Sequence, residues 1–197
     1  DITGDNKAKR EEQLDVIIDE AKRLTELVNE ILVVSQQNST SKLNKTDFDF
    51  SELVESVVKK FDFDNSGYNF RRDVKKGLWV NADRHKIEQV LFNFISNAVK
   101  YCGKDKEIII VVKEAGGSAR FDVFDHGNGI SKQEQKYIWD RFSRASQKYK
   151  RGDSTGLGLS IVRSILKSHD AVFGVNSAVG KGSDFYFELP LVEPPQN

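Results

Sequence analysis

Two asparagines, Asn93 and Asn97, lie within a segment that is otherwise almost entirely apolar. We expect a helix here, capped at its start by Asp83, and residues four apart then lie on one face of it. Lys100 and Tyr101 continue the same face. Because a neutral amide that leaves water without a new partner costs free energy, these side chains require something polar to bind. The segment therefore predicts a helix with a core face and a ligand face.

About thirty residues further on, Asp125 ends a predicted strand and is followed by Gly127, Gly129 and Ile130. Glycines at these positions let the backbone turn and approach a ligand closely. A buried Asp carboxylate accepts a hydrogen bond from the amino group of adenine but rejects the carbonyl oxygen of guanine. An Asp beside a Gly is more often an ordinary turn, so the adenine interpretation depends on the other motifs.

A second glycine motif, Thr155-Gly156-Leu157-Gly158-Leu159, precedes another predicted helix. Backbone N–H groups at such a helix start can bind phosphate oxygens. The motif lacks the spacing and the Gly-Lys-Ser/Thr ending of a P-loop, and it does not follow a first strand as a dinucleotide fingerprint does. With the other two motifs it predicts an ATP site in which a metal-bound triphosphate meets the two amides.

The stretch between Phe142 and Gly156 is polar and basic, and it has no apolar periodicity. We interpret it as a lid over the phosphates. An ordinary solvated loop explains the same composition equally well, because connecting segments with many charges usually lie at the surface.

Residues 7–37 contain neither Pro nor Gly, and apolar residues recur there at alternating steps of three and four. They are Leu14, Ile17, Ala21, Leu24, Val28 and Ile31. This heptad seam predicts a long helix that packs against a second helix or a second copy of the chain, with the chain's own globular part as the alternative. A polar linker follows. We expect a helix over 1–40, an ATP-binding domain over 41–192 and a disordered tail over 193–197.

Past the linker, strand-like and helix-like segments are mixed. The expected strands lie at 47–50, 68–74, 78–80, 106–113, 119–125, 172–176 and 184–189. The expected helices are one capped by Ser51, the one capped by Asp83, one from Ser131 to Trp139 and one from Leu157 to Ser168. This order predicts an α+β domain, a two-layer α/β sandwich with a mixed, mostly antiparallel sheet, helices on one face and a nucleotide between the layers.

The charge balance excludes a strong global field. The chain has 30 basic and 30 acidic residues, which gives no attraction for nucleic acid or an anionic membrane. Its one cysteine, Cys102, excludes an internal disulfide and is interpreted as a small residue at a helix end. No apolar run has the length of a membrane span. Because the chain begins at Asp1 and contains no Met, we expect a piece of a longer protein, and a membrane-anchored parent is compatible with this.

The three histidines are His85, His126 and His169. None has other Cys or His residues near it at the spacing of a zinc site, and none has a Ser or Cys partner arranged for nucleophilic catalysis. We therefore expect surface or helix-end packing for each of them.

Taken in order, these motifs resemble the catalytic and ATP-binding domain of bacterial sensor histidine kinases. The superfamily also includes type II topoisomerase, heat-shock chaperone and mismatch-repair ATPases. The resemblance covers an N box (Asn93, Asn97, Lys100, Tyr101), a first glycine box (Asp125, Gly127, Gly129), an F box (138–142), a second glycine box (Gly156, Gly158) and a closing segment (180–190). It implies a Bergerat-type ATP-binding fold.

The resemblance also implies roles at the phosphates. Asn97 binds Mg²⁺, with Asn93 close to the phosphates and to the metal. Lys100 neutralises phosphate charge. Arg141 or Arg144, which follow the F box, reach the γ-phosphate.

At the base, the resemblance implies that Asp125 holds the adenine amino group and that Tyr101 packs near the nucleotide. The remaining expected contacts come from the two glycine boxes, the F box and the closing segment. They are Gly127, Gly129, Ile130, Phe142, Thr155, Gly156, Leu157, Gly158, Leu159 and Ser183.

The N-terminal segment from Leu14 to Ser35 resembles the second helix of the dimerisation and phosphotransfer hairpin of such kinases. The acceptor segment, His-Glu-x-x-Thr-Pro, does not occur in the sequence, and Ser154 stands where many members have Gly. The implied partners are the phosphoacceptor helix of the parent kinase, a response regulator receiver domain and a second copy through the N-terminal helix. No nucleic acid is implied, and a membrane only through other segments of the parent. The implied location is the cytoplasmic side of a membrane-anchored sensor.

The expected function is that of an ATP-dependent protein-histidine kinase with Mg²⁺ as the metal. Two alternatives stay open from the sequence. One is a non-catalytic nucleotide-binding and dimerisation module, and the other is an anti-sigma-type Ser/Thr protein kinase. The long heptad helix argues against the second alternative.

Overall fold

The structure is a computed structural model that describes Arg10, Gln13 and residues 43–64, 67–140 and 157–195. The chain divides into two units, Asp1–Ser41 and Lys42–Asn197, and the helices and strands named below belong to the second. Apart from Arg10 and Gln13, the predicted heptad helix lies outside the described residues, and so does the predicted lid.

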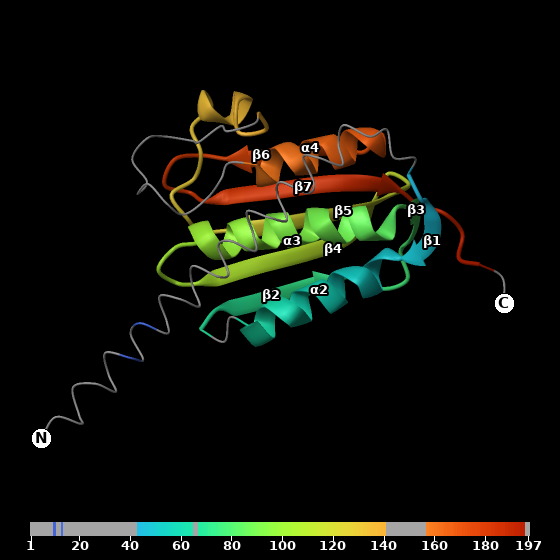
Figure 1. Cartoon of the computed structure of the whole chain (residues 1–197), viewed down its shortest axis with the longest axis horizontal. Helices are drawn as coiled ribbons and strands as arrows, with labels where there is room; N and C mark the ends of the chain where they lie inside the picture. The colour runs from blue at the N-terminus through green and yellow to red at the C-terminus, as the bar shows by residue number, and fades with distance from the viewer. Residues whose placement is uncertain (1–9, 11–12, 14–42, 65–66, 141–156, 196–197) are drawn as a thin grey trace, which may run out of the picture. The chain divides into compact units, whose positions relative to one another are not determined.

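A five-stranded sheet forms one layer of the domain (Figure 1). Its order is β2 (Asn69–Val74), β4 (Glu107–Ala115), β5 (Ser118–Asp125), β7 (Ser183–Pro190) and β6 (Val172–Ser177). The pair β2 and β4 is parallel, and the other pairs are antiparallel. The prediction of a mixed, mostly antiparallel sheet is confirmed.

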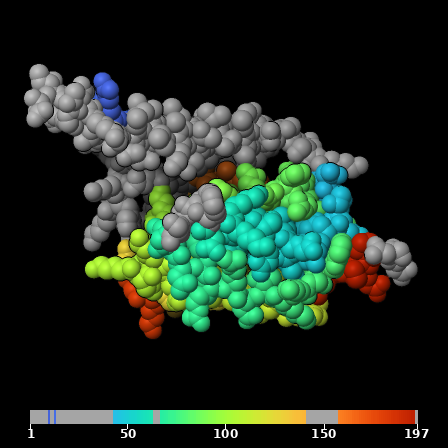
Figure 2. Space-filling model, turned by 90° about the horizontal axis from the view of Figure 1, so that it is seen from below, coloured from blue at the N-terminus to red at the C-terminus, as the bar shows by residue number. Residues whose placement is uncertain are grey.

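Three helices cover one face of this sheet (Figure 1). They are α2 (Phe50–Asp64), α3 (Arg84–Tyr101) and α4 (Gly158–Ser168). Each turns an apolar stripe towards the strands, as helices in a two-layer domain must to bury their hydrophobic surface. The predicted two-layer sandwich with helices on one face is thus confirmed. Figure 2 shows the domain from the side of α2 and β2, whose cyan-to-green atoms form a continuous surface.

The core lies between the two layers. Along β4, Ile108, Ile110 and Val112 are buried at alternate positions, as the pleat of a strand requires. Phe94 of α3 is fully buried, and its ring centroid lies 5.4 Å from that of Phe185 in β7. This aromatic packing fixes the ligand-bearing helix against the sheet.

A second, two-stranded sheet precedes the main one in the chain. It pairs β1 (Thr46–Asp49) with β3 (Trp79–Ala82) in antiparallel fashion. An isolated bridge joins Val80 to Leu191 just after β7. Among the described residues, no helix combines the length and the apolarity needed to cross a membrane.

Asp83 caps α3 as predicted. Its side chain accepts a hydrogen bond from the backbone N–H of Lys86 at 3.2 Å. The backbone N–H of Asp83 in turn donates to Nε2 of buried His169 at 3.0 Å, while Nδ1 of His169 donates to the carbonyl oxygen of Ile165 at 2.8 Å. His169 therefore ties the end of α4 to the start of α3, and burial lowers its pKa.

The predicted capping role of Ser51 is wrong. Helix α2 already begins at Phe50, and Asp49 accepts the hydrogen bond from the backbone N–H of Glu52 at 3.1 Å. The Ser51 hydroxyl instead donates to the carbonyl oxygen of Lys75 at 2.7 Å. Ser51 is buried against the loop between β2 and β3, and that tertiary contact decides its role.

The helix predicted from Ser131 to Trp139 is also wrong in length, since only the 3-10 helix η1 (Glu134–Lys136) forms. Ser131 and Glu134 do form a reciprocal capping pair, with N–H to oxygen distances of 3.0 and 3.2 Å. One turn supplies too few backbone hydrogen bonds to sustain a longer helix without more buried surface.

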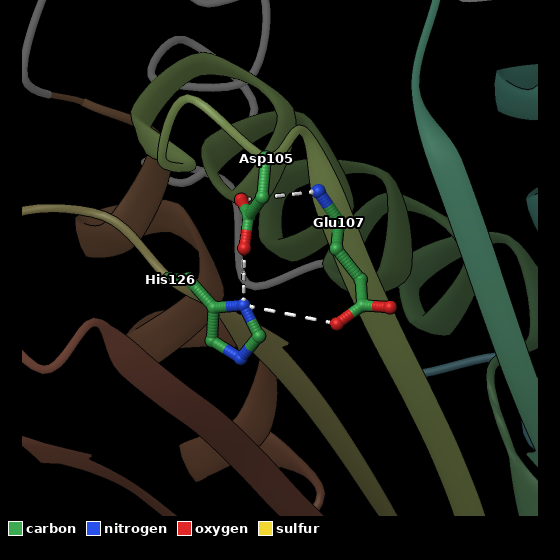
Figure 3. A group of neighbouring side chains, drawn as sticks. All are labelled: Asp105, Glu107 and His126. Atoms are coloured by element: carbon green, nitrogen blue, oxygen red, sulfur yellow. Dashed lines mark hydrogen bonds and ion pairs between the residues drawn. The ribbon is translucent and has the colours of Figure 1, made fainter.

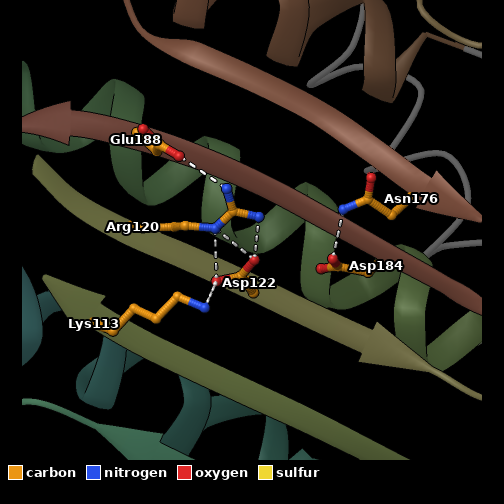
Figure 4. A network of polar contacts seen from close by, with 6 residues as sticks. All are labelled: Lys113, Arg120, Asp122, Asn176, Asp184 and Glu188. Atoms are coloured by element: carbon orange, nitrogen blue, oxygen red, sulfur yellow. Dashed lines mark hydrogen bonds and ion pairs between the residues drawn. The ribbon is translucent and has the colours of Figure 1, made fainter. Parts of the chain in front are cut away.

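The face of the sheet away from the helices carries a network of charges (Figure 4). The guanidinium of Arg120 donates to Asp122 at 2.7 Å and to Glu188 at 2.8 Å, and Lys113 lies 3.6 Å from Asp122. The side chain of Asp122 is only 2 % exposed. Arg120 stacks over the ring of Tyr186, with 4.0 Å from its Cζ to the ring centroid. This cover allows a buried carboxylate on an otherwise open face.

Candidate functional site

The N-box residues occupy the second half of α3. Asn93 and Asn97 are half-buried, whereas Lys100 and Tyr101 are exposed. The Nζ atom of Lys100 lies 5.6 Å from the centroid of the Tyr101 ring. The predicted ligand face therefore runs from the edge of the core out to solvent, with the cation at its solvent end.

Asn93 lies directly against the start of α4. Its Nδ2 donates to the carbonyl oxygen of Gln89 at 2.9 Å, within the same helix. A β-carbon on Gly158 would lie 2.7 Å from its Oδ1. The second glycine box therefore meets the N box where α4 begins, and the absence of a side chain at Gly158 makes this approach possible.

Gly127 joins the first glycine box to the end of α3. A β-carbon at this position would overlap the carbonyl oxygen of Tyr101, and it would lie 2.8 Å from Oδ1 of Asp125. Any other residue would push the loop away from the helix. The three motifs that are separate in the sequence thus converge around the C-terminal half of α3.

Asp125 ends β5 and is 5 % exposed. Its Oδ1 accepts a hydrogen bond from the backbone N–H of Gly127 at 2.8 Å. Burial raises its pKa to about 6, against the opposite effect of hydrogen bonds from the backbone of Gly127 and Ser183. At neutral pH the carboxylate is mostly ionised and can accept a hydrogen bond.

The first glycine box interlocks with the segment between β6 and β7. Gly129 and Gly182 have φ values of 67° and 76°, which favour glycine. A β-carbon on Gly129 would overlap the carbonyl oxygen of Ala178, and one on Gly182 would overlap that of Asp125. The closing segment therefore fixes the conformation of the loop that carries Asp125.

Ser177 at the end of β6 is a site residue that the sequence did not indicate. Its Oγ accepts from the N–H of Ile130 at 2.8 Å, donates to the carbonyl oxygen of Gly182 at 2.7 Å and lies 3.1 Å from Oγ of Ser183. Gln135 donates to the carbonyl oxygens of both Ile130 and Ser177 at 2.8 Å. Ser177 thus links the loop after β5 to the start of β7 through hydrogen bonds. The Ser183 hydroxyl lies beside that of Ser177 and faces the same loop.

The second glycine box is described only in part. Leu157 is buried just before α4, and Leu159 is half-buried in its first turn. The remaining predicted site residues lie outside the described residues: Arg141, Phe142, Arg144, Thr155 and Gly156.

A cavity of about 350 Å³ lies beside the first glycine box. Its lining includes Ile109 and Phe124, whose neighbours along each strand are buried beneath the helices. Successive side chains of a strand point to opposite faces, so Ile109 and Phe124 face away from the N box, whereas Asp125 and Ser183 of the candidate site also line this cavity.

A comparison with known families is consistent with this arrangement. Residues 82–193 match the family model described as histidine kinase-, DNA gyrase B-, and HSP90-like ATPase. The chain belongs to this family of ATPases. The predicted family resemblance is confirmed.

The curated relatives are sensor kinases. The chain is 32% identical over 185 residues to the signal transduction histidine-protein kinase ArlS of Staphylococcus epidermidis, a match that covers 92% of this chain and 41% of the relative. It is 34% identical over 187 residues to the sensor protein SrrB of Staphylococcus aureus, covering 92% and 32%. The chain therefore spans less than half the length of these relatives.

Solved structures of histidine kinases share the fold. The histidine kinase ThkA in complex with the response regulator protein TrrA matches with a TM-score of 0.71 and 28% identity, covering 98% of this chain and 53% of that one. Full-length ShkA in complex with AMPPNP matches with a TM-score of 0.77 and 24% identity, covering 95% and 40%. The ShkA likeness is evidence for the fold alone.

Proposed function

We propose that this chain is the catalytic and ATP-binding part of a two-component sensor histidine kinase. The observation that carries the proposal is the convergence of the buried Asp125 carboxylate, the Tyr101 end of α3 and the Asn93–Gly158 contact. The ATPase family and the sensor-kinase relatives support it.

In this proposal Asp125 selects adenine. Its carboxylate accepts a hydrogen bond from the amino group of the base, and guanine presents a carbonyl oxygen there instead. The interlocked turns at Gly127 and Gly182 hold the carboxylate at the end of β5. A fixed acceptor discriminates better than a mobile one, because it cannot turn away from a mismatched base.

The N box would hold the metal and the phosphates. The side-chain oxygens of Asn93 and Asn97 are hard donors of the kind that Mg²⁺ prefers, so the residues present fit this ion. When bound, Mg²⁺ would neutralise charge on the phosphates. Lys100 adds a positive charge at the exposed end of the same helix, and Arg141 or Arg144 would add another.

The start of α4 would bind phosphate oxygens through the backbone N–H groups of Gly158 and Leu159. The contact between Gly158 and Asn93 places these donors beside the N box. Phosphoryl transfer depends mainly on positioning and charge neutralisation, and in this proposal the arrangement would supply both.

The acceptor would be a His on the phosphoacceptor helix of the parent kinase. The bond from the γ-phosphorus to the bridging oxygen breaks to leave ADP, a phosphorus–nitrogen bond forms, and the imidazole loses its proton. The phosphoryl group would then pass to an Asp of a response regulator. We also propose that the parent is a membrane-anchored bacterial sensor with this part in the cytoplasm, and that residues 14–35 take part in dimerisation.

Phosphotransfer in trans tests the proposal. The chain is incubated with γ-labelled ATP, Mg²⁺ and a separate helical hairpin that carries an acceptor His. We expect label on the hairpin that is lost in acid, because phosphohistidine is acid-labile, and no label with Asn97→Ala. An acid-stable label would indicate a Ser/Thr kinase instead. Nucleotide binding without any transfer, to this or to a matched parental hairpin, would favour the non-catalytic module.

A further inference from the structure

Three side chains of metal-binding type converge beside the first glycine box (Figure 3). Nδ1 of His126 lies 2.6 Å from Oδ2 of Asp105 and 3.8 Å from Oε2 of Glu107. One donor atom from each residue can be chosen so that all three lie within 4.8 Å of one another. Asp105 lies just before β4 and Glu107 is its first residue, whereas His126 follows β5, so the cluster forms only in the folded chain.

We propose that Asp105, Glu107 and His126 bind a divalent transition-metal cation of the Zn²⁺ class. One imidazole nitrogen and two carboxylate oxygens form a suitable three-ligand set, and a water molecule completes a tetrahedron. An imidazole ligand favours Zn²⁺ over Mg²⁺, which prefers an octahedron of oxygens. The site is therefore distinct in chemistry from the all-oxygen set of the N box.

The carboxylate oxygens that do not face His126 are held by other donors. Oδ1 of Asp105 accepts from the backbone N–H of Glu107 at 3.3 Å. Oε1 of Glu107 accepts from Arg71 at 3.4 Å and from Asn69 at 3.5 Å, both on the neighbouring strand β2. Each carboxylate thus presents its second oxygen to His126. Such outer contacts commonly orient metal ligands.

The backbone of the turn before β4, which carries Asp105, packs against the residue His126. Lys106, between the two carboxylates, has a φ of 52°, a left-handed conformation that is uncommon for Lys. Its ammonium lies 5.3 Å from the ring centroid of Tyr68 and is engaged there. A β-carbon on Gly103 would lie within 2.4 Å of the carbonyl oxygen of His126, so the turn before β4 packs directly on the residue that follows Asp125.

The distances and the exposure suit an ion that enters from solvent. The side chains of Asp105 and His126 are 46% exposed and that of Glu107 is 22% exposed. Two ligands about 2.1 Å from one ion at a tetrahedral angle lie about 3.4 Å apart. The distances from Nδ1 of His126, 2.6 Å to Asp105 and 3.8 Å to Glu107, fall on either side of this value. To bind the ion, the Asp105 oxygen has to move away from His126 by less than about 1 Å, and the Glu107 oxygen has to move towards it by a smaller amount.

Calorimetric titration of the nucleotide-free chain with ZnCl₂ tests the proposal. We expect saturable one-to-one binding, and the visible absorption of tetrahedral cobalt when CoCl₂ replaces ZnCl₂. Asp105→Asn and Glu107→Gln should each weaken Zn²⁺ binding by roughly tenfold or more. His85→Ala removes another exposed histidine and should leave the affinity unchanged. Thermal unfolding of each metal-free variant confirms that it is folded.

Two results would overturn the proposal. The first is the absence of saturable Zn²⁺ binding in the micromolar range, which would leave only a His126–Asp105 ion pair. The second is an affinity that is unchanged in both carboxylate variants. Because no nucleotide is present, neither result bears on the proposed kinase function.

Discussion

The side-chain oxygen of Asn93 lies so close to Gly158 that an added β-carbon would come within 2.7 Å of it. Asn93 is in the middle of α3, and Gly158 is the first residue of α4. The two motifs expected to hold the phosphates are thus in contact although the sequence separates them by 65 positions. A single surface made of amide oxygens and helix-start N–H groups follows from this contact.

Gly158→Ala should therefore weaken nucleotide binding, because the added methyl group displaces the Asn93 side chain. We expect a loss of about 1–2 kcal/mol, or roughly tenfold in the dissociation constant of an ATP analogue measured by calorimetry. Gly67→Ala is the matched control, since the nearest atom to its β-carbon would be 3.6 Å away. An unchanged affinity in Gly158→Ala would show that the contact does not shape the site.

Asp125→Asn should weaken ATP binding by about 1–3 kcal/mol, because the amide can present a donor where adenine requires an acceptor. In the unsubstituted chain, the affinity for ATP should also fall as the pH drops below about 6, where the carboxyl group of Asp125 is protonated. The variant should lack that pH dependence. Equal affinities of the two proteins at pH 7.5 would rule out the adenine role.

The same substitution should stabilise the nucleotide-free domain at alkaline pH. The pKa of Asp125 is raised from 3.8 to about 6 in the folded state, so the fold favours the protonated form. Its contribution to stability is full below pH 3.8 and is lost as the pH rises through 6. We expect Asp125→Asn to gain about 1–3 kcal/mol in urea unfolding at pH 8 and little at pH 4. A gain that is equal at both pH values would contradict a raised pKa.

Arg120→Ala should destabilise the domain by about 2–4 kcal/mol, because among the described residues it leaves the buried Asp122 carboxylate with Lys113, 3.6 Å away, as its cationic partner. Lys75→Ala provides a contrast, since it removes an exposed ion pair with Glu114 and should cost less than about 1 kcal/mol. Urea unfolding at pH 7.5 measures both. Similar losses of unfolding free energy in the two variants would mean that Arg120 and its neighbours do not isolate the Asp122 carboxylate from water.

Local patterns were sufficient to predict the parts of the site that lie on one element. The apolar periodicity and the Asp83 cap predict α3, and the four-residue spacing places both asparagines on one face. The short runs rich in Ile, Val and Phe at 108–112 and 121–124 predict the strands β4 and β5. These features depend on residues that are close together in the chain, so they can be predicted from the local sequence.

Contacts between distant segments were not predictable in the same way. Ser177 is an ordinary strand residue in the sequence and becomes a hydrogen-bonding centre only where β6 meets the loop after β5. Ser51 resembled a cap but binds a distant loop. His126 has no Cys or His near it in the sequence, and its carboxylate neighbours, Asp105 and Glu107, lie about twenty positions earlier in the chain, so only the fold brings the three together.

Binding of a non-hydrolysable ATP analogue with and without Mg²⁺ tests the central claim most directly. Calorimetry should show saturable binding that Mg²⁺ strengthens, with no comparable binding of the GTP analogue. Asn97→Ala should lose the Mg²⁺-dependent part of the affinity and keep the rest. Binding that does not distinguish the two bases, or an Asn97→Ala loss that is equal with and without Mg²⁺, would contradict the account.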